Sequence, residues 1–155
     1  MKLSKTAWLI LGIGIFVIAF ATLYMLYSQQ AGEQEQNAGY WVSRDAQMHQ
    51  DIVTGDDPAT PGVTEFLALT WADWDSNDVY TVIYNLVDNK LQREHYTNKD
   101  GSPPDATAFL AQYIDPDQTS CVWDDSAGTL TFTVTATVEE QSETRIYEVV
   151  PRPGS

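Results

Sequence analysis

Hydrophobic residues are distributed in two different ways along this chain. Residues 7–27 form one nearly unbroken apolar run, AWLILGIGIFVIAFATLYMLY, in which Thr22 is the only polar member. After this run the apolar residues are separated by polar ones, first at intervals of three and four and later in alternation. Intervals of three and four are typical of a helix, and alternation is typical of β-strands. The pattern therefore predicts a helical first part followed by a β-rich part.

The apolar run has the length expected of a transmembrane helix. At about 1.5 Å per residue it would measure roughly 31 Å, close to the thickness of the hydrocarbon core of a bilayer. Lys2 and Lys5 precede the run, and no acidic residue occurs before Glu33. The positive-inside rule then places residues 1–6 in the cytoplasm and the rest of the chain outside the cell membrane. We therefore expect a single-pass protein whose residues 7–28 have membrane lipid as their partner.

A cleavable signal peptide is the alternative interpretation of the same run. Ala19-Phe20-Ala21 has the small-x-small form of a cleavage site. Residues 22–27, however, continue the apolar run beyond that site, and the run is longer than the usual core of a signal peptide. An uncleaved anchor is the prediction that we carry forward.

Residues 29–53 have the pattern of an amphipathic helix. Apolar residues recur there at helical spacing, and polar residues fill the other face; the apolar ones are Ala38, Trp41, Val42, Met48, Ile52 and Val53. Gly32 and Gly39 are weak points for a helix, and a flexible stalk remains the alternative for residues 29–38. The preferred picture is one long helix that continues from the apolar run onto a folded domain.

The remainder, residues 54–155, is predicted to be an extracytoplasmic β-rich domain. A segment dense in turn-forming residues, 54–62, separates it from the helix. Strands are expected at residues 64–71, 79–87, 91–96, 120–123, 129–138 and 144–150, with turns at Asp88-Asn89 and Ser126-Ala127-Gly128. Pro103-Pro104-Asp105 is expected to begin a short helix at residues 106–113. The predicted fold class is α+β, with the long helix packed on one antiparallel sheet that contains this short inserted helix.

Charge and cysteine content limit the partners of this domain. The chain has a net charge of −14, and because residues 1–30 carry +2 the remainder carries −16. Such an excess of acid argues against nucleic acid as a partner. Cys121 is the only cysteine, so the chain has no internal disulfide. We expect Cys121 to be a buried apolar residue, with pairing to another molecule as the alternative.

No motif for catalysis, for a cofactor or for a metal stands out. His49 and His95 are the only histidines, and neither belongs to a zinc-binding pattern. We expect His49 on the flank of the helix, solvated or capping, and His95 at an exposed cross-strand position. Carboxylates are too numerous for any pair to be informative. We therefore expect a protein that is not an enzyme; a carboxylate-dependent hydrolase is the weakest alternative.

The acidic segment of residues 73–78 is the one candidate for cation binding. Asp73, Asp75 and Asn77 have the spacing of the first three ligands of an EF-hand loop. Asp78 stands where that loop needs glycine, and Tyr84 stands where it needs glutamate. A polar turn before the next strand is therefore the preferred interpretation, and weak calcium binding is left open.

Three tryptophans support an alternative function. Trp71, Trp74 and Trp123 lie in or beside predicted strands. They are either core residues or exposed contacts for a sugar or peptide, in which case the chain would be a membrane-tethered ligand-binding module.

Several segments together resemble a known family. Residues 40–48, YWVSRDAQM, follow an apolar N-terminal helix, and VYTVIY at 79–84, LQR at 91–93 and the strand at 130–138 follow them in turn. This order resembles that of type IV pilin-like proteins, in particular prepilin-type minor pilins and larger minor pseudopilins, over about residues 38–150. Residues 6–11 lack the glycine cleavage point and the glutamate of the family's usual processing site.

The resemblance implies a function as well as a fold. It implies a non-enzymatic, membrane-anchored subunit of a pilin-like, secretion or surface assembly, with protein partners in an envelope complex. In a filament, the apolar helix would pack in the core.

Overall fold

The computed structural model describes residues 5–55, 65–73 and 75–151, and the side chains of residues 17–55, 66–73 and 75–151. One helix, α1 (Lys5–Ala46), is followed by eight strands. The strands are β1 (Asp51–Thr54), β2 (Glu65–Ala72), β3 (Val79–Val87), β4 (Lys90–Thr97), β5 (Ala106–Gln112), β6 (Ser120–Asp124), β7 (Thr129–Val138) and β8 (Gln141–Val149). Most of the predicted turn segment 54–62 lies outside the described residues.

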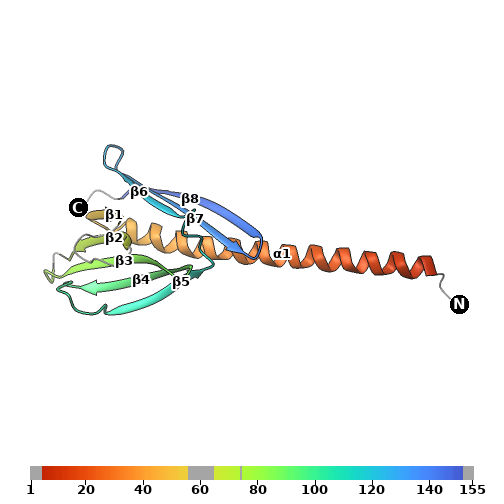
Figure 1. Ribbon diagram of the computed structural model, residues 1–155. Helices are drawn as coiled ribbons and strands as arrows, with labels where there is room; N and C mark the ends of the chain where they lie inside the picture. Colours follow the sequence, from red (N-terminus) through yellow and green to blue (C-terminus); the bar gives the residue numbers. More distant parts are fainter. Residues whose placement is uncertain (1–4, 56–64, 74, 152–155) are drawn as a thin grey trace.

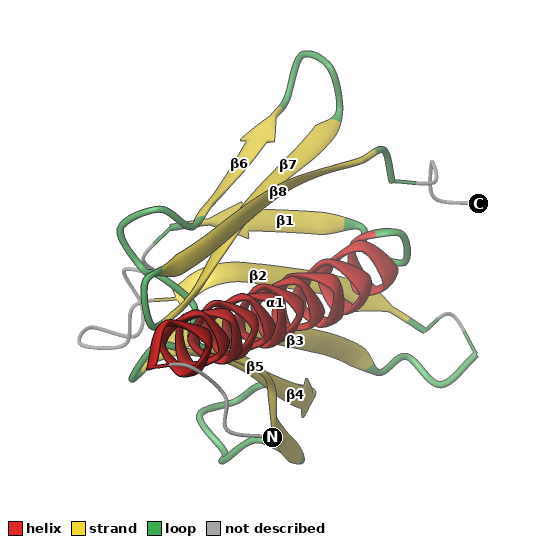
Figure 2. Cartoon of the chain, turned by 90° about the vertical axis from the view of Figure 1, so that its right-hand side faces the viewer, coloured by secondary structure: helices red, strands yellow, loops and turns green. Residues whose placement is uncertain are grey.

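The strands form two antiparallel sheets that enclose one half of α1. One sheet has the order β1-β2-β3-β4-β5 and the other β6-β7-β8. Figure 2, in which α1 is seen towards its end, shows the helix between the two sheets, with β7 and β8 above it and β3, β4 and β5 below it. Figure 1 shows that the other half of α1 extends beyond both sheets. The fold is thus a helix packed on antiparallel sheets, which agrees broadly with an α+β class.

One face of α1 supplies the helix side of the core. Residues at alternating steps of four and three fall on one side of a helix, and on α1 these are Val17, Ala21, Tyr24, Ser28, Ala31, Glu35, Ala38, Val42 and Asp45. We call this set the seam. From Ala31 onwards every seam residue is buried, and the small side chains of Ala31 and Ala38 let the sheets approach the helix closely. The seam is therefore the surface that both sheets share.

Two seam residues are buried acids, and each contacts a different sheet. Asp45, 1% exposed, accepts hydrogen bonds from the Tyr84 hydroxyl at 2.7 Å and from Arg93 Nε at 2.6 Å. Glu35, fully buried, lies 3.2 Å from Arg145 Nε on β8. A buried charge is costly unless it is paired. These pairs therefore favour one rotation and one axial position of the helix against the sheets.

Gly39 is a point of close approach between helix and sheet. A Cβ atom at this position would lie 2.0 Å from Cζ of Tyr147 on β8. The Tyr147 ring stacks on Phe132, and its hydroxyl donates to the backbone carbonyl of Glu35 at 3.2 Å. The glycine that weakens the helix locally is thus what allows an aromatic side chain to lie on the helix backbone.

The expectation of a membrane span is wrong. Over the residues that the structure describes, α1 has no stretch that is both long and apolar enough to cross a bilayer. The transmembrane helix at residues 7–28, the single-pass topology with a cytoplasmic N-terminus and the location at the cell membrane are corrected accordingly. The lipid contact predicted for residues 7–28 depended on that span.

The predicted short helix at residues 106–113 is also wrong, because residues 106–112 form β5, which pairs with β4. Seven residues are too few for a stable isolated helix, and pairing with the edge of β4 satisfies their backbone groups instead. The chain then crosses to the other side of α1 and builds a second sheet, where a single sheet was expected.

The long helix is also shorter at its C-terminal end than its pattern predicted. It ends at Ala46, and Asp51–Thr54 forms β1 against β2. The other predicted strands are present. The turn at Asp88-Asn89 joins β3 to β4 with φ values of 50° and 58°, as a type I′ turn requires.

We predict opposite outcomes for alanine at the two glycines of α1. Gly39→Ala gains helix propensity but forces the Tyr147 ring to move, so it should lower the free energy of unfolding by about 1–3 kcal/mol. Gly32→Ala is the matched control, because its nearest neighbour is the flexible end of Glu143, 3.1 Å away; it should be neutral or stabilising by up to about 1 kcal/mol. Urea unfolding measures both, and equal effects would contradict the role given to Gly39.

Candidate functional site: the uncovered half of α1

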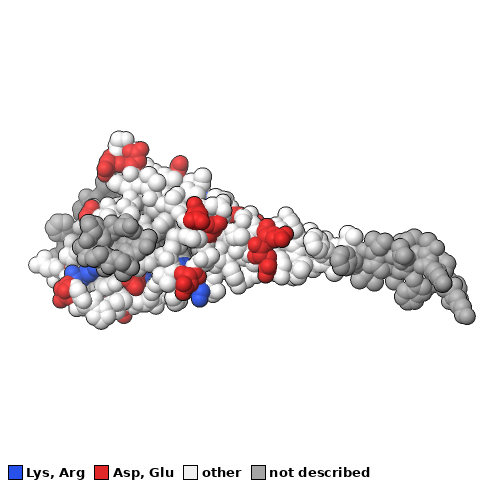
Figure 3. Space-filling view, in the orientation of Figure 1, with Lys and Arg blue, Asp and Glu red and all other residues white. Residues whose placement is uncertain are grey.

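The uncovered half of α1 presents large apolar side chains to the surroundings. Seven such residues are exposed between positions 17 and 26, with exposed fractions from 47% at Leu23 to 68% at Ile18; they are Val17, Ile18, Phe20, Leu23, Tyr24, Met25 and Leu26. No charged residue occurs between Lys5 and Glu33, and the part of α1 between the globular body and the grey residues is uncharged on the face seen in Figure 3. Contiguous apolar surface of this kind marks an interaction site.

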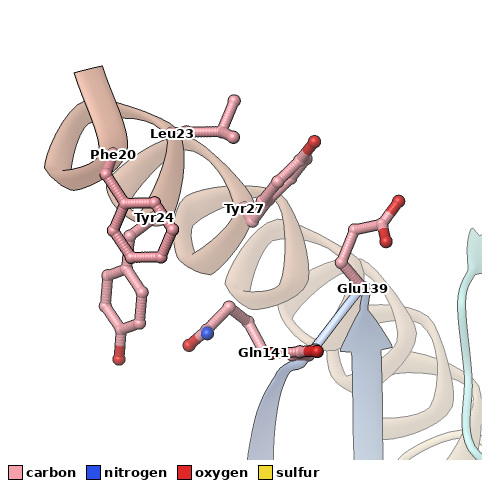
Figure 4. Close-up of a pocket in the computed structure, with 7 residues that line it drawn as sticks. Phe20, Leu23, Tyr24, Tyr27, Glu139 and Gln141 are labelled. Carbon is pink, nitrogen blue, oxygen red and sulfur yellow. The ribbon is translucent and has the colours of Figure 1, made fainter. Parts of the chain in front are cut away.

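A groove lies where this half of the helix meets the tip of the β7–β8 hairpin. It has a volume of about 340 Å³ and is lined by Phe20, Leu23, Tyr24, Tyr27, Glu139, Glu140 and Gln141. Figure 4 shows the aromatic side chains of α1 on one side and Glu139 and Gln141 of the hairpin on the other. A second hollow, of about 460 Å³, adjoins it along the helix and is lined by Val17, Phe20, Ala21 and Tyr24. All four residues also belong to the seam or to the groove, so the two hollows follow the same face of α1.

The hairpin that forms one wall of the groove is attached to α1 by a polar cluster. Ser28 Oγ donates to Glu143 Oε1 at 3.1 Å, and Arg145 Nε lies 3.2 Å from Glu35 Oε2. No well-aligned hydrogen bond reaches the buried Glu35 carboxyl oxygens within the described part of the chain. Burial raises the pKa of Glu35; the Glu143 carboxylate acts in the same direction, and the Ala136 backbone and Arg145 oppose it.

His49 and Cys121 have structural surroundings. His49 lies beyond the end of α1, where Nδ1 contacts the Ala46 carbonyl and the ring meets Trp123 edge-on at 6.0 Å. It is therefore a capping residue and is buried, not solvated; burial lowers its pKa. Cys121 on β6 is half-buried against the core, and burial raises the pKa of its thiol to about 12. A thiol with that pKa is a weak nucleophile at neutral pH.

The tryptophans proposed as ligand contacts are already in contact with other side chains. The rings of Trp71 and Tyr80 stack at 5.8 Å, and His95 stacks on Tyr80 at 5.7 Å. His95 thus holds a cross-strand position on β4, as expected, but it is half-buried in an aromatic cluster and not exposed. Trp123 donates from Nε1 to Asp125 Oδ1 at 2.6 Å. Trp74 lies outside the described residues.

Of the acidic segment 73–78, Asp73 and residues 75–78 are described, and they lie between β2 and β3. Asp73 Oδ1 accepts the Asp75 backbone N–H at 2.9 Å, and Asp78 Oδ1 accepts from Asn98 Nδ2 at 2.8 Å. The hydrogen bonds from Asn98 and Ser76 lower the pKa of Asp78. In the described part of the chain no three metal-ligating side chains converge, here or elsewhere.

Sequence reasoning did not identify the groove. Its two walls are more than one hundred residues apart in the chain, and only the fold places Glu139 beside Tyr27. A usable signal was present for the helix wall, because the seam spacing that predicts a buried face at Ala38 and Val42 continues without a break to Tyr24, Ala21 and Val17.

Comparisons of this chain with protein-family models, with curated proteins and with solved structures found no match. The pilin-like resemblance is therefore neither supported nor opposed by them, and it stays a prediction.

We predict that Glu35 gives the wall of the groove a pH-dependent stability. The folded state holds the Glu35 proton more tightly than the unfolded chain, so the contribution is complete below about pH 4.5 and is lost as the pH rises through the raised pKa. Glu35→Gln removes this loss. The free energy of unfolding of Glu35→Gln should therefore rise relative to wild type between about pH 4.5 and pH 7.5. Urea unfolding across this pH range measures the difference, with the exposed Glu148→Gln as control. If the free energy of unfolding of Glu35→Gln followed the same pH dependence as that of wild type, the effect would be excluded.

Proposed function

We propose that this chain is a non-enzymatic subunit of a pilin-like, secretion or surface assembly, and that it enters the assembly through the uncovered half of α1. The observation that carries the proposal is the continuity of the seam. The face that is buried against the sheets from Ala31 to Asp45 continues on the same side of the helix to Val17. N-terminal to Tyr27 the sheets no longer cover this face.

The size of the uncovered surface supports a protein–protein contact. Seven large apolar side chains that are each about half exposed present on the order of several hundred Å², the size at which an apolar patch is often functional. A stable interface buries about 800 Å² on each partner. At about 25 cal/mol per Å², covering this surface would stabilise an assembly strongly before the cost of association is subtracted.

The buried polar groups also favour a structural role. Asp45, Tyr84 and Arg93 hold the helix to the five-stranded sheet, and Glu35 with Arg145 holds it to the other sheet. Each of these groups thus has a packing partner, and together they position the helix that carries the exposed surface. The class of assembly rests on the resemblance of residues 38–150 to minor pilins and pseudopilins.

We expect the full chain to associate with a dissociation constant below about 100 μM, which corresponds to about −5.5 kcal/mol. Replacing Ile18, Phe20, Tyr24 and Leu26 together by Gln keeps a good helix former at each position and should weaken association at least tenfold. Sedimentation velocity over a concentration series measures this, and circular dichroism verifies folding.

The matched control changes polar residues of the same helix. Gln29→Ala with Asn37→Ala alters two exposed residues outside the apolar surface and should leave association unchanged. A wild-type chain that stays monomeric throughout the series, or a fourfold variant that associates like wild type, would refute the proposal. Cross-linking in the cells that express the chain tests whether the assembly is of the surface or secretion class. The cross-links to partner proteins that wild type forms should be lost in the fourfold variant.

A further inference from the structure

Two acidic side chains border the apolar surface of α1. Glu139 and Glu140 form the tip of the β7–β8 hairpin, and they line the groove together with the rings of Phe20, Tyr24 and Tyr27. Both carboxylates belong to exposed residues, and the described residues that line the groove include no lysine or arginine. The groove therefore has an aromatic wall on the helix and an acidic wall on the hairpin.

A partner that covers this apolar surface must also take up the two carboxylates. Covering Tyr24 and Tyr27 removes water from Glu139 and Glu140, and a carboxylate that loses water is costly unless a positive charge pairs with it. The faces of aromatic rings also attract guanidinium and ammonium groups. Both walls of the groove thus favour the same kind of side chain, a base.

The described bases of this chain are engaged at other places. Each lies over a ring or pairs with an acid: Arg44 and Arg93 over Trp41, Lys90 over Phe109, Lys99 over Tyr96, and Arg145 with Glu35. The ends of the described chain are also distant from the groove. Lys5 begins α1 roughly 28 Å from Tyr24 by helix length, and β8 carries the chain roughly 26 Å from the hairpin tip to Val149. A base in the groove is therefore expected from another molecule.

The shape of the neighbouring surface suits a helix. The second hollow adjoins the groove along α1, and its described lining, Val17, Phe20, Ala21 and Tyr24, is apolar. Ala21 is small, so the backbone of a second helix can approach closely at this position. The helix residues of the two hollows are centred about three positions apart, or roughly one helical turn. A helix with apolar side chains in the second hollow therefore presents its next turn to the groove.

We propose that the groove receives an arginine or lysine from a helix of another subunit of the assembly, a protein different from this chain, whose apolar side chains occupy the adjoining hollow. This inference rests on the proposed function and names the chemistry of its partner. The partner helix carries apolar residues on one turn and a base on the next turn of the same face, which is how helices are read in apolar grooves. Its charge is complementary to a chain of net charge −14.

The backbone at Glu139 allows its charge to be tested apart from its place in the turn. Glu139 has a φ of 56°, in the left-handed region that asparagine and glycine adopt more readily than glutamate. The corresponding turn between β3 and β4 has Asp88 and Asn89 at such angles. Glu139→Asn therefore suits the turn better while it removes the carboxylate.

Synthetic helical peptides measure this recognition on the full chain. The probe has leucine at positions i and i+3 and arginine at i+7, in a neutral background of alanine and glutamine. One control peptide has citrulline, a neutral analogue of arginine, at i+7, and another has the arginine at i+9, on the opposite face of the helix. Fluorescence anisotropy of the labelled peptides should show the probe binding roughly three- to thirtyfold more tightly than either control.

Two double variants place the base in the groove. Glu139→Asn with Glu140→Gln should remove most of the preference for the arginine probe over the citrulline control, while the midpoint of urea unfolding stays the same or rises. Asp117→Asn with Glu148→Gln removes the same charge from exposed positions elsewhere and should keep the preference. Self-association of the first variant, measured by sedimentation velocity, should be unchanged or stronger, because neutralised copies repel each other less.

The outcomes separate this inference from the proposed function. If either control peptide binds as tightly as the arginine probe, if no peptide binds below about 1 mM, or if the preference survives the loss of Glu139 and Glu140, the inference is overturned and the assembly role is untouched. If that variant self-associates more weakly than wild type, the occupant is a second copy, which also overturns the inference. A wild-type chain that stays monomeric yet prefers the arginine probe refutes the proposed function by its own test and leaves the chemistry of the groove standing.

Discussion

The packing of both sheets on one face of a single helix is the constraint from which the rest of the structure follows. The small residues of the seam allow close contact, and Gly39 admits the Tyr147 ring. Asp45 and Glu35 then fix rotation and axial position, because each buried carboxylate has its partner on a particular strand. A helix held in this way is a rigid support, and its free half projects at a defined angle with a defined face. The groove exists only because the hairpin tip is held against that face.

Local chemistry determined which parts of the fold could be predicted. The strands at 79–87 and 129–138 and the turn at Asp88-Asn89 are encoded by alternation and turn residues within a few positions, so they were predicted well. Residues 106–112 contain both helix and strand formers, and the free edge of β4 decided their state. The division into two sheets and the strand at 51–54 depend on contacts between distant segments. The groove belongs to the same class, since it requires Glu139 to meet Tyr27 across more than one hundred residues.

The apolar run has two properties, its length and its phase, which is the side of the helix on which its residues lie. Its length favours a bilayer span, which the described part of the helix does not support. Phase relates the same residues to the core: Val17, Ala21 and Tyr24 continue the series that includes Ala31, Ala38 and Val42. Residues that share the phase of a buried face are suited to contact with protein. That property links the fold to the proposed subunit role more directly than hydrophobicity alone.

The uninterrupted helical connection at residues 27–31 has a consequence for how sequence length could vary here. One inserted or deleted residue at this junction would turn everything N-terminal to it by about 100° about the helix axis. The body would keep its structure, but Phe20 and Tyr24 would swing away from the hairpin tip, and the groove would lose one wall. Substitutions at this junction alter chemistry at single positions, whereas a change in length would disconnect two otherwise intact halves. Relatives of this chain that retain the groove should therefore keep the spacing between Tyr24 and Glu35 constant.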